Sequence, residues 1–485
     1  TIRRTSNTGE LMIILGTNSI KETGFDVANS CRFDGTSAYL HKATSSGTNT
    51  KFTYSVWIKR SSSAGIYPRI LGSHTNSSAY LRLNFNRAAD GEKLHLYSET
   101  SGGASTLLTN RSFRDSSAWM HILVAVDTTD GTADDRQKIY INGVQETSFA
   151  TRSNPSQNAD YRINNASSTI TVGKKSFPDE ASDFFNGYMA EVHYIDGTAY
   201  APTDFGEFDS DSGIWKPIEV SGISYGTNGF YLDFKDSANL GNDANGGTDL
   251  TEVNLAAIDQ STDTCTNNFA TMNPLAYRLD SGVSLPTYSE GNTVVSYAND
   301  SGAGKSTMAT IGFQNGKWYW EYKVGTANDT IFGGITRMDY DPNDNFAGRS
   351  CYYNKTGAFS VGTGTGGTAD GSYGNSYTTG DIIGVAFDCD NGVIWFSKNG
   401  TWQNSATQSE IEAGTTTNSA TTGITLNQFW SPFFEGANGG MSANFGSPAY
   451  AISSGNTDGD GFGNFEYAVP SGYFALCTKN LAEYG

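Results

Sequence analysis

Residues 380–400, GDIIGVAFDCDNGVIWFSKNG, limit what this chain can fold into more than any other stretch. Residues 382–389 alternate between two sets of side chains, the period of a β-strand. Asp390-Asn391-Gly392 then supplies residues that tolerate a positive φ, as a short hairpin turn requires. Residues 393–396 form a second β-rich run, and Asn399-Gly400 forms a second turn. The stretch therefore predicts two antiparallel strands joined by a tight turn.

The composition extends this prediction to the whole chain of 485 residues. The sequence holds 56 Gly, 26 Tyr, 27 Phe and 8 Trp, with long runs rich in Ser, Thr and Asn. Many short strands with polar turns give such a profile, and good helix formers are sparse in any continuous window. Because one sandwich does not need this length, we expect more than one domain.

The first half contains motifs that occur in a fixed order. They are Phe33 in FDGTSAYL, Trp57 in FTYSVWIK, His121 in WMHILVAVD, Asn142-Gly143 in KIYINGVQ and Glu191 in GYMAEVHY. In this order they resemble the laminin-G-like/concanavalin A-like lectin family, over roughly residues 28–200. The resemblance implies a jelly-roll sandwich of two antiparallel sheets.

The second half carries a different set of motifs, at 317–322 (KWYWEY), 332–335 (FGGI), 380–400, 429–435 and 442–446, with 472–478 closing the sheet. This set resembles the SPRY domain, over about 290–485. SPRY domains are β-sandwich binding modules, and the resemblance implies recognition by loops at one end of the sandwich.

The predicted fold is therefore all-β, with two antiparallel, jelly-roll-like β-sandwich domains. We expect an N-terminal segment at 1–27, a lectin-like sandwich at 28–200, an ordered Gly/Asn-rich connector at 201–289 and a SPRY-like sandwich at 290–485. A connector of this length without regular elements would be unusual, so short strands are expected inside it.

The net charge of −19 disfavours binding to nucleic acid, because an acidic surface repels the phosphate backbone. No stretch has the length of a membrane span or of a secretory signal, so no membrane insertion is expected. Cys31, Cys265, Cys351, Cys389 and Cys477 lack any CxxC spacing, and buried free thiols are the preferred interpretation of Cys389 and Cys477.

The sequence lacks the residue patterns that several known classes of enzyme require. Glycosidases of concanavalin A-like folds need two carboxylates in one cleft, and Glu191 and Asp196 would fall on opposite faces of an unbroken strand. Residues 302–307 (GAGKST) lack the first glycine of a phosphate-binding loop and precede a strand pattern, so an exposed turn is preferred. His121 and His193 are read as structural residues within strands. We predict no enzyme activity, with a glycan hydrolase as the open alternative.

Two Asp/Asn-rich loops, 339–345 (DYDPNDN) and 458–460 (DGD), could supply oxygen ligands for calcium. Asp, Asn and Gly also favour turns for backbone reasons, and this second interpretation is preferred. The prediction therefore includes no metal and no cofactor.

Surface aromatic residues offer large contact area to sugars at low entropic cost. By the SPRY resemblance, the 338–354 loop and the region of Trp430 are the best candidates for ligand contact. The candidate residues are Tyr340, Asp341, Asn345, Tyr352, Tyr353 and Trp430. Ordinary loop packing is the alternative role for them.

A lectin-like sandwich, a connector and a SPRY-like sandwich in this order resemble virion proteins of tailed bacteriophages, as fibre, tail or capsid-decoration components. The resemblance implies a structural protein made in the host cytoplasm, where a signal peptide is not needed. Its expected partners are other virion proteins and host cell-surface glycans, with copies assembled as a homo-oligomer on the particle. A purely architectural protein without a ligand is the further alternative.

Overall fold

The computed structural model describes residues 23–61, 67–76, 79–175, 183–279, 284–299, 305–327, 331–338, 350–361, 371–420, 424 and 426–485. These residues divide into two compact units, an N-terminal unit (Thr23–Thr266) and a C-terminal unit (Asn267–Gly485). The prediction of an all-β fold built from antiparallel sheets is confirmed.

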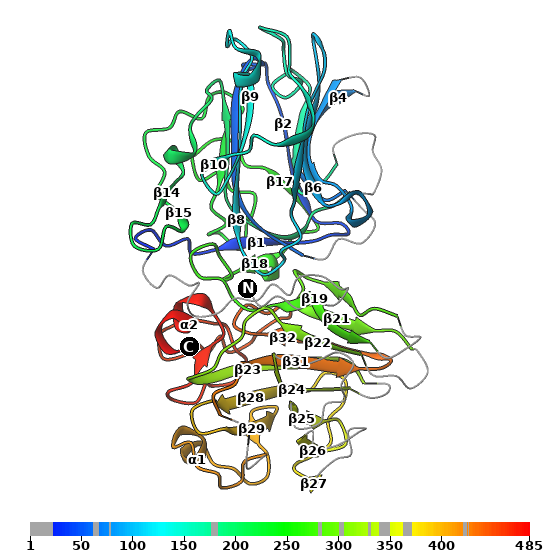
Figure 1. Cartoon of the computed structure of the whole chain (residues 1–485), viewed down its shortest axis with the longest axis vertical. Coiled ribbons are helices and arrows are strands. Elements are labelled where there is room, and N and C mark those ends of the chain that lie inside the picture. The colour runs from blue at the N-terminus through cyan, green and yellow to red at the C-terminus, as the bar shows by residue number, and fades with distance from the viewer. Residues whose placement is uncertain are drawn as a thin grey trace. The chain divides into compact units, whose positions relative to one another are not determined.

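Two sheets form the N-terminal unit (Figure 1). The first, named here the β3 sheet, contains in spatial order β10 (Val144–Gln145), β9 (Gln137–Ile141), β8 (Met120–Asp127), β3 (Lys51–Arg60), β13 (Asn186–Asp196), β1 (Ser30–Asp34) and β18 (Gln260–Ser261), and β16 (Phe230–Leu232) also pairs with β13. The second, the β5 sheet, contains β11 (Phe149–Ser153), β7 (Gly103–Ser112), β6 (Lys93–Thr100), β5 (Ala79–Phe85), β4 (Arg69–Asn76), β12 (Thr169–Val172), β2 (Tyr39–Ala43) and β17 (Thr251–Val253).

One hydrophobic core fills the space between these two sheets. Alternate residues of β3, such as Tyr54 and Val56, meet alternate residues of β5 and β6, such as Leu83 and Leu96, and all four are fully buried. The period of two along each strand places the remaining side chains on the outer faces. Each sheet therefore presents one outer face, on which a binding site could lie.

The segment after position 200 belongs largely to the N-terminal unit. The hairpin of β14 (Gly206–Phe208) and β15 (Trp215–Pro217) lies on the side of the β3 sheet away from the β5 sheet (Figure 1). Strands β16, β17 and β18 pair with β13, β2 and β1 of the sandwich. The short strands expected there are present, but the connector predicted at 201–289 divides between the two units at 266/267.

The C-terminal unit is also a sandwich of two sheets. The β31 sheet contains β19 (Met272–Leu279), β22 (Lys305–Ala309), β31 (Trp430–Gly436), β24 (Ile331–Arg337), β25 (Ser350–Asn354), β26 (Ala358–Val361) and β27 (Gly371–Ser372). The β28 sheet contains β20 (Thr287–Ser289), β21 (Val294–Tyr297), β32 (Gly439–Asn444), β23 (Lys317–Ala327), β28 (Ile382–Asp388), β29 (Val393–Lys398) and β30 (Thr401–Trp402), with β33 (Phe474–Ala475) pairing parallel to β23.

The hairpin predicted at 380–400 is formed by β28 and β29, with Asp388 opposite Val393. Gly392 and Asn399 adopt φ of 65° and 49°, as the predicted turns require. Side chains from both faces of β28 are buried: Phe387 lies in the main core, and Ala386 lies in a second cluster with Trp395 and Tyr473. The C-terminal segment therefore covers the outer face of this sheet.

Among the described residues, helical structure is limited to short pieces. They are α1 (Gln408–Glu412), α2 (Thr478–Tyr484) and the 3-10 turns η2 (Ala88–Asp90), η3 (Ala133–Asp135), η4 (Pro202–Asp204) and η5 (Ala257–Asp259). The strand expected at 472–478 is shorter than predicted, since only Phe474–Ala475 pair and α2 begins at Thr478. Within the described ranges, no helix is long and apolar enough to cross a lipid bilayer.

Candidate functional site

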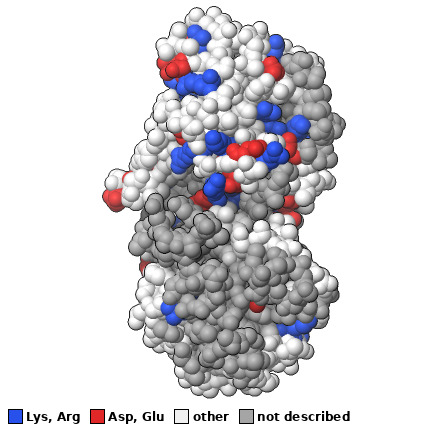
Figure 2. Space-filling model, turned by 45° about the vertical axis from the view of Figure 1, so that its right-hand side comes forward, with Lys and Arg blue, Asp and Glu red and all other residues white. Residues whose placement is uncertain are grey.

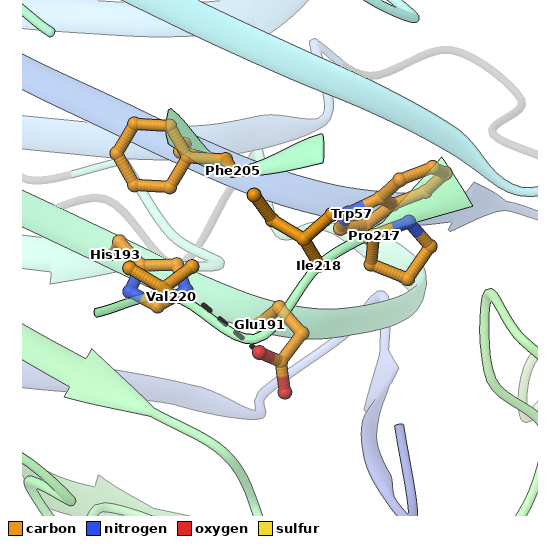
Figure 3. A pocket seen from close by; sticks show the side chains of 8 residues that line it. Trp57, Glu191, His193, Phe205, Pro217, Ile218 and Val220 are labelled. Carbon is orange, nitrogen blue, oxygen red and sulfur yellow. Dashed lines mark ion pairs between the residues drawn. The ribbon is translucent and has the colours of Figure 1, made fainter. Parts of the chain in front are cut away.

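The outer face of the β3 sheet holds a small pocket (Figure 3). Its lining comprises Ser55, Trp57, Glu191, His193, Phe205, Pro217, Ile218 and Val220. The first four belong to β3 and β13, and the other four belong to the segment that follows β13. The chain thus builds both the floor and the cover of this pocket.

Glu191 enters the pocket because β13 is irregular there. The pairing between β13 and β3 shifts its register between Ala190 and His193, and Glu191 adopts a φ of 46°. The expectation of an unbroken strand through Glu191 and Asp196 is therefore wrong. A bulge inserts an extra residue and re-aims the side chains near it.

Two tyrosines hold the polar groups of β13. The hydroxyl of Tyr231 donates to Glu191 Oε2 at 2.8 Å, and the hydroxyl of Tyr225 lies 2.7 Å from His193 Nδ1. His193 Nε2 lies 3.8 Å from Glu191 Oε2. Both the histidine and the glutamate are almost fully buried. The prediction that His193 is a structural residue within a strand agrees with the bond from Nδ1 to Tyr225, whereas its buried Nε2 has no hydrogen-bond partner among the described residues.

His121 lies on the same face and is stacked between Trp57 and Trp215, with ring centroids 5.1 Å and 5.9 Å away. The indole of Trp215 donates to His121 Nδ1 at 3.1 Å, so the ring proton is on Nε2, which donates to Ser55 Oγ at 2.8 Å. Burial lowers the pKa of His121 to about 3 and keeps the ring neutral at pH 7. In this tautomer His121 cannot accept the proton of Ser55.

The second carboxylate considered for catalysis is engaged elsewhere. Asp196 Oδ1 accepts from the backbone of Thr48 at 2.8 Å and from Asn164 Nδ2 at 3.0 Å. Its Oδ2 accepts from the backbone of Asn228 at 3.2 Å. Asp196 therefore connects three loops at the end of β13 by hydrogen bonds, whereas the carboxylate of Glu191 accepts a hydrogen bond from Tyr231.

The pocket is too narrow to hold a water molecule. A sugar ring could enter only if the segment carrying Phe205, Pro217, Ile218 and Val220 moved away. In the described conformation, the outer face of the β3 sheet is closed.

The outer face of the β5 sheet is built differently. Tyr80 and Arg82 of β5 and His95, Tyr97 and Glu99 of β6 are only partly buried, and they alternate with leucines of the core. Arg82 pairs with Tyr97 across the two strands. Figure 2, which brings this side of the molecule forward, shows basic side chains interspersed with acidic ones on the N-terminal unit. We name this group of five side chains the β5 platform.

Contacts within the β5 platform fix its side chains. Tyr80 and Tyr97 stack with centroids 5.5 Å apart, and the Arg82 guanidinium lies 4.6 Å from the Tyr97 ring centroid. The Tyr97 hydroxyl donates to Glu99. His95 Nε2 lies 2.9 Å from Thr106 Oγ1 on β7, and burial with the nearby Arg82 charge lowers the pKa of His95 to about 4.

The guanidinium of Arg82 has unused hydrogen-bonding capacity. Among the described residues no carboxylate lies within ion-pair distance of its guanidinium, and its Nε is buried without a hydrogen-bond partner. A buried donor without an acceptor costs about 1–3 kcal/mol. Arg82 as a whole is only partly buried, and an anionic ligand group would pair with the charge of its guanidinium.

Three of the predicted contact residues lie in strands and are buried, which corrects the expectation of exposed loop positions. Tyr353 of β25 stacks on Phe396, and Trp430 of β31 packs edge-on against Phe387, both inside the core. Tyr352 stacks on Phe332 on the outer face of the β31 sheet and is 3% exposed. Burial of large aromatic area outweighs their position next to a polar loop. The other three predicted residues, Tyr340, Asp341 and Asn345, lie outside the described residues.

Two further sequence features have structural roles. Asp458 Oδ2 accepts from the backbone of Ala475 at 2.9 Å and from Asn480 Nδ2 at 2.7 Å, while Oδ1 accepts from the 458–462 turn. Lys305, Ser306 and Thr307 are buried in β22, so this half of the exposed turn expected at 302–307 is a strand, and residues 302–304 lie outside the described residues. The calcium loop proposed at 339–345 lies outside the described residues.

The β5 platform was not predicted, although the sequence carries its signal. In AYLRLNF (79–85) and KLHLYSE (93–99), polar and aromatic residues alternate with Leu81, Leu83, Leu94 and Leu96, and with Phe85 and Ser98 at the ends of the pattern. This pattern indicates strands with one solvent-facing side. The pattern does not indicate which of the two sheets has an exposed outer face, because the residues that cover the β3 sheet lie far along the chain.

Comparison with known proteins supports both domain predictions. Residues 34–201 match the family described as the concanavalin A-like lectin/glucanases superfamily, and residues 317–416 match the SPRY domain. No curated protein matches the chain.

Several solved structures resemble parts of the chain. The SPRY domain of human HERC1 is 16% identical, with a TM-score of 0.26, over 36% of this chain and 96% of that chain. The heptameric SAP-like pentraxin of Limulus polyphemus is 15% identical, with a TM-score of 0.26, over 36% and 80%. Domain 4 of AbnA, an extracellular arabinanase of Geobacillus stearothermophilus, in complex with arabinotriose, is 16% identical, with a TM-score of 0.25, over 34% and 68%.

Proposed function

We propose that this chain, which joins a concanavalin A-like lectin/glucanase domain to a SPRY domain, is a non-enzymatic recognition protein that binds glycans through the β5 platform. The observation that carries the proposal is the contrast between the two outer faces of the N-terminal unit. One is closed by the chain itself, and the other presents tyrosines, a carboxylate and an arginine that forms no ion pair with any described residue.

The chemistry of the platform favours a glycan with an anionic substituent. Arg82 can donate to a carboxylate, phosphate or sulfate, and Glu99 can accept from a sugar hydroxyl. The edges of the stacked Tyr80 and Tyr97 rings add apolar contact beside these groups. The chain has a net charge of −19, and a negatively charged ligand would match the positive charge of Arg82.

Binding rather than hydrolysis is favoured by the state of the buried groups. Glu191 is covered and accepts from Tyr231, and His121 donates to Ser55. Neither arrangement provides an acid and a base flanking a substrate bond. New reducing ends released from a bound polysaccharide would overturn the non-enzymatic part.

The binding test compares two arginines of the same unit. The substitution R82A should weaken binding of purified protein to polygalacturonate at least tenfold, since a charge-assisted hydrogen bond contributes about 1.5–3 kcal/mol. The matched control R111A removes an equal charge from the exposed Arg111 of β7 and should leave binding unchanged. Equal binding by R82A and wild type, or equal binding of wild type to neutral dextran, would overturn the proposed ligand site.

The biological setting we propose is the virion of a tailed bacteriophage, where the chain would contact other virion proteins and host surface glycans as a homo-oligomer. This part is supported by the order of the two domains along the sequence. Mass spectrometry of purified particles of the phage that encodes the chain provides the test. Absence of its peptides from those particles would contradict the proposed virion location, and this result would not bear on the proposed glycan site.

A further inference from the structure

The outer face of the β3 sheet holds a buried charge pair that the proposed function does not use. Lys59 Nζ lies 2.6 Å from Asp263 Oδ2, and each side chain is 1% exposed. Lys59 is on the long strand β3, and Asp263 follows β18 at the end of the unit, 204 residues later. The contact therefore joins an early strand to the closing segment of the sandwich.

Neighbouring groups orient the carboxyl of Asp263. The indole Nε1 of Trp119 donates to Oδ1 at 2.9 Å, so the two carboxyl oxygens have different partners. Ser30 Oγ donates to the Asp263 carbonyl at 2.6 Å, and the Asp263 amide donates to Ser261 Oγ at 3.1 Å. Both the backbone and the side chain of this aspartate are thus fixed toward Lys59.

The surroundings of Lys59 are aromatic. Its Nζ lies 5.7 Å from the Tyr188 ring centroid, and Trp119 packs beside the same tyrosine. Burial lowers the pKa of Lys59, although the nearby Asp263 acts in the opposite direction. Transfer of one proton across the 2.6 Å contact yields a neutral amine and a carboxylic acid, which avoids burying two charges.

We propose that Lys59 and Asp263 condense to an intramolecular amide bond. The lone pair of the neutral Nζ attacks Cγ, the atom bonded to Oδ2, which lies 2.6 Å from Nζ. Such attacks begin from a separation of about 3–3.5 Å between the reacting atoms. Negative charge then develops on Oδ1, where the Trp119 N–H stabilises it. The C–Oδ2 bond breaks, and this oxygen leaves as water with protons that Nζ gives up. An ammonium and a carboxylate thus become one amide and one water, without any co-reactant.

The chain contains an internal comparison for this chemistry. Lys42, which is partly buried, has its Nζ 3.8 Å from Oδ2 of the buried Asp243. Oδ1 of Asp243 accepts from the backbone of Tyr231 and Asn245, while its Oδ2 has no hydrogen-bond donor among the described residues. Because both proximity and a polarising indole are missing there, only the Lys59–Asp263 pair is expected to react.

Mass spectrometry of the purified, denatured full chain provides the test. The wild-type mass should be lower than the sequence mass by one water molecule, and trypsin should release the Lys59 peptide joined to the Asp263 peptide. K59R should show the full sequence mass, and the control K42R should keep the loss of one water. In D263N the same attack should release ammonia, so this variant should weigh one ammonia molecule less than its own sequence mass, rather than one water molecule less.

The variant W119F tests whether the indole N–H of Trp119 assists the reaction, because this substitution should leave the fold intact. It keeps the aromatic packing and removes the donor to Oδ1, so freshly folded protein should accumulate the joined peptide more slowly than wild type. A wild-type mass equal to the sequence mass, with separate Lys59 and Asp263 peptides, would mean a buried ion pair only and would overturn the amide. This result does not depend on whether any variant folds.

Discussion

Tyr231 lies flat against His193, with ring centroids 4.2 Å apart and planes inclined by only 9°. The hydroxyl of the same tyrosine donates to Glu191, so one side chain of β16 holds both polar residues of the β13 bulge. Since β16 follows position 200, the sandwich depends on residues beyond the predicted end of the lectin-like domain.

Removing the hydroxyl of Tyr231 should therefore destabilise the N-terminal unit. Y231F keeps the stacking on His193 but leaves the buried Glu191 carboxylate without its 2.8 Å donor. We expect a loss of about 1–3 kcal/mol in the free energy of unfolding, measured in denaturant. Y140F is the matched control, because the hydroxyl of Tyr140 makes no hydrogen bond among the described residues. A loss no larger than that of Y140F would contradict the role assigned to Tyr231.

His121 should make the stability of the N-terminal unit fall at acidic pH. Its pKa is about 3 in the folded state and near 6.5 when exposed, so the unfolded state binds more protons below pH 6.5. The stabilisation is complete above pH 6.5 and is lost as the pH falls toward 3. Each pH unit in this window costs about 1.4 kcal/mol, or about 2 kcal/mol between pH 7 and 5.

The variant H121Q isolates this effect, because glutamine can still accept from Trp215 and donate to Ser55. Denaturant unfolding of H121Q should show a smaller difference between pH 7 and pH 5 than wild type. His95, whose pKa is also lowered, contributes equally to both proteins and cancels from the comparison. The same pH dependence in both proteins would contradict a neutral, buried His121.

The strands of the central hairpins could be predicted from sequence because local signals agree there. In 380–400 the period of two, the β-branched residues and the Asp-Asn-Gly turn all favour one register. Asn142-Gly143 likewise closes the β9–β10 hairpin, with φ of 48° and 76°. Such turn residues act through their own backbone, so no distant contact is needed to predict them.

Features that depend on distant contacts could not be predicted. The bulge at Glu191 has no local glycine at the shifted position and is held by Tyr231, forty residues later in sequence. Tyr352 and Tyr353 adjoin a polar loop, yet pairing with β24 and β26 draws them into a sheet. The β5 platform is accessible because the chain covers the other sheet instead, and this choice depends on the tertiary fold.

Gly143 should be sensitive to substitution for a reason that Gly213 does not share. Both glycines have positive φ, of 76° and 69°, but a Cβ on Gly143 would lie 2.4 Å from the Trp215 ring, whereas Gly213 has nothing within 4 Å. G143A should therefore cost about 1–3 kcal/mol more than G213A, since Trp215 must shift off His121. Unfolding monitored by tryptophan fluorescence measures the difference, and equal losses would show that only the backbone conformation matters.

Glu321 of β23 is expected to be the most sensitive carboxylate of the C-terminal unit. Its fully buried side chain accepts from the Tyr319 hydroxyl at 3.0 Å and from the backbone amides of Glu466 and Tyr467 at 3.0 Å and 2.8 Å. These hydrogen bonds connect the β28 sheet to the C-terminal segment that covers its outer face. E321Q replaces one acceptor oxygen with an NH2 group that faces another N–H donor, so it should cost about 1–3 kcal/mol. Hydrogen exchange should show the amides of Glu466 and Tyr467 losing protection, whereas E483Q, at an exposed position, should leave them unchanged. Unaltered protection of both amides in E321Q would rule out this fastening role.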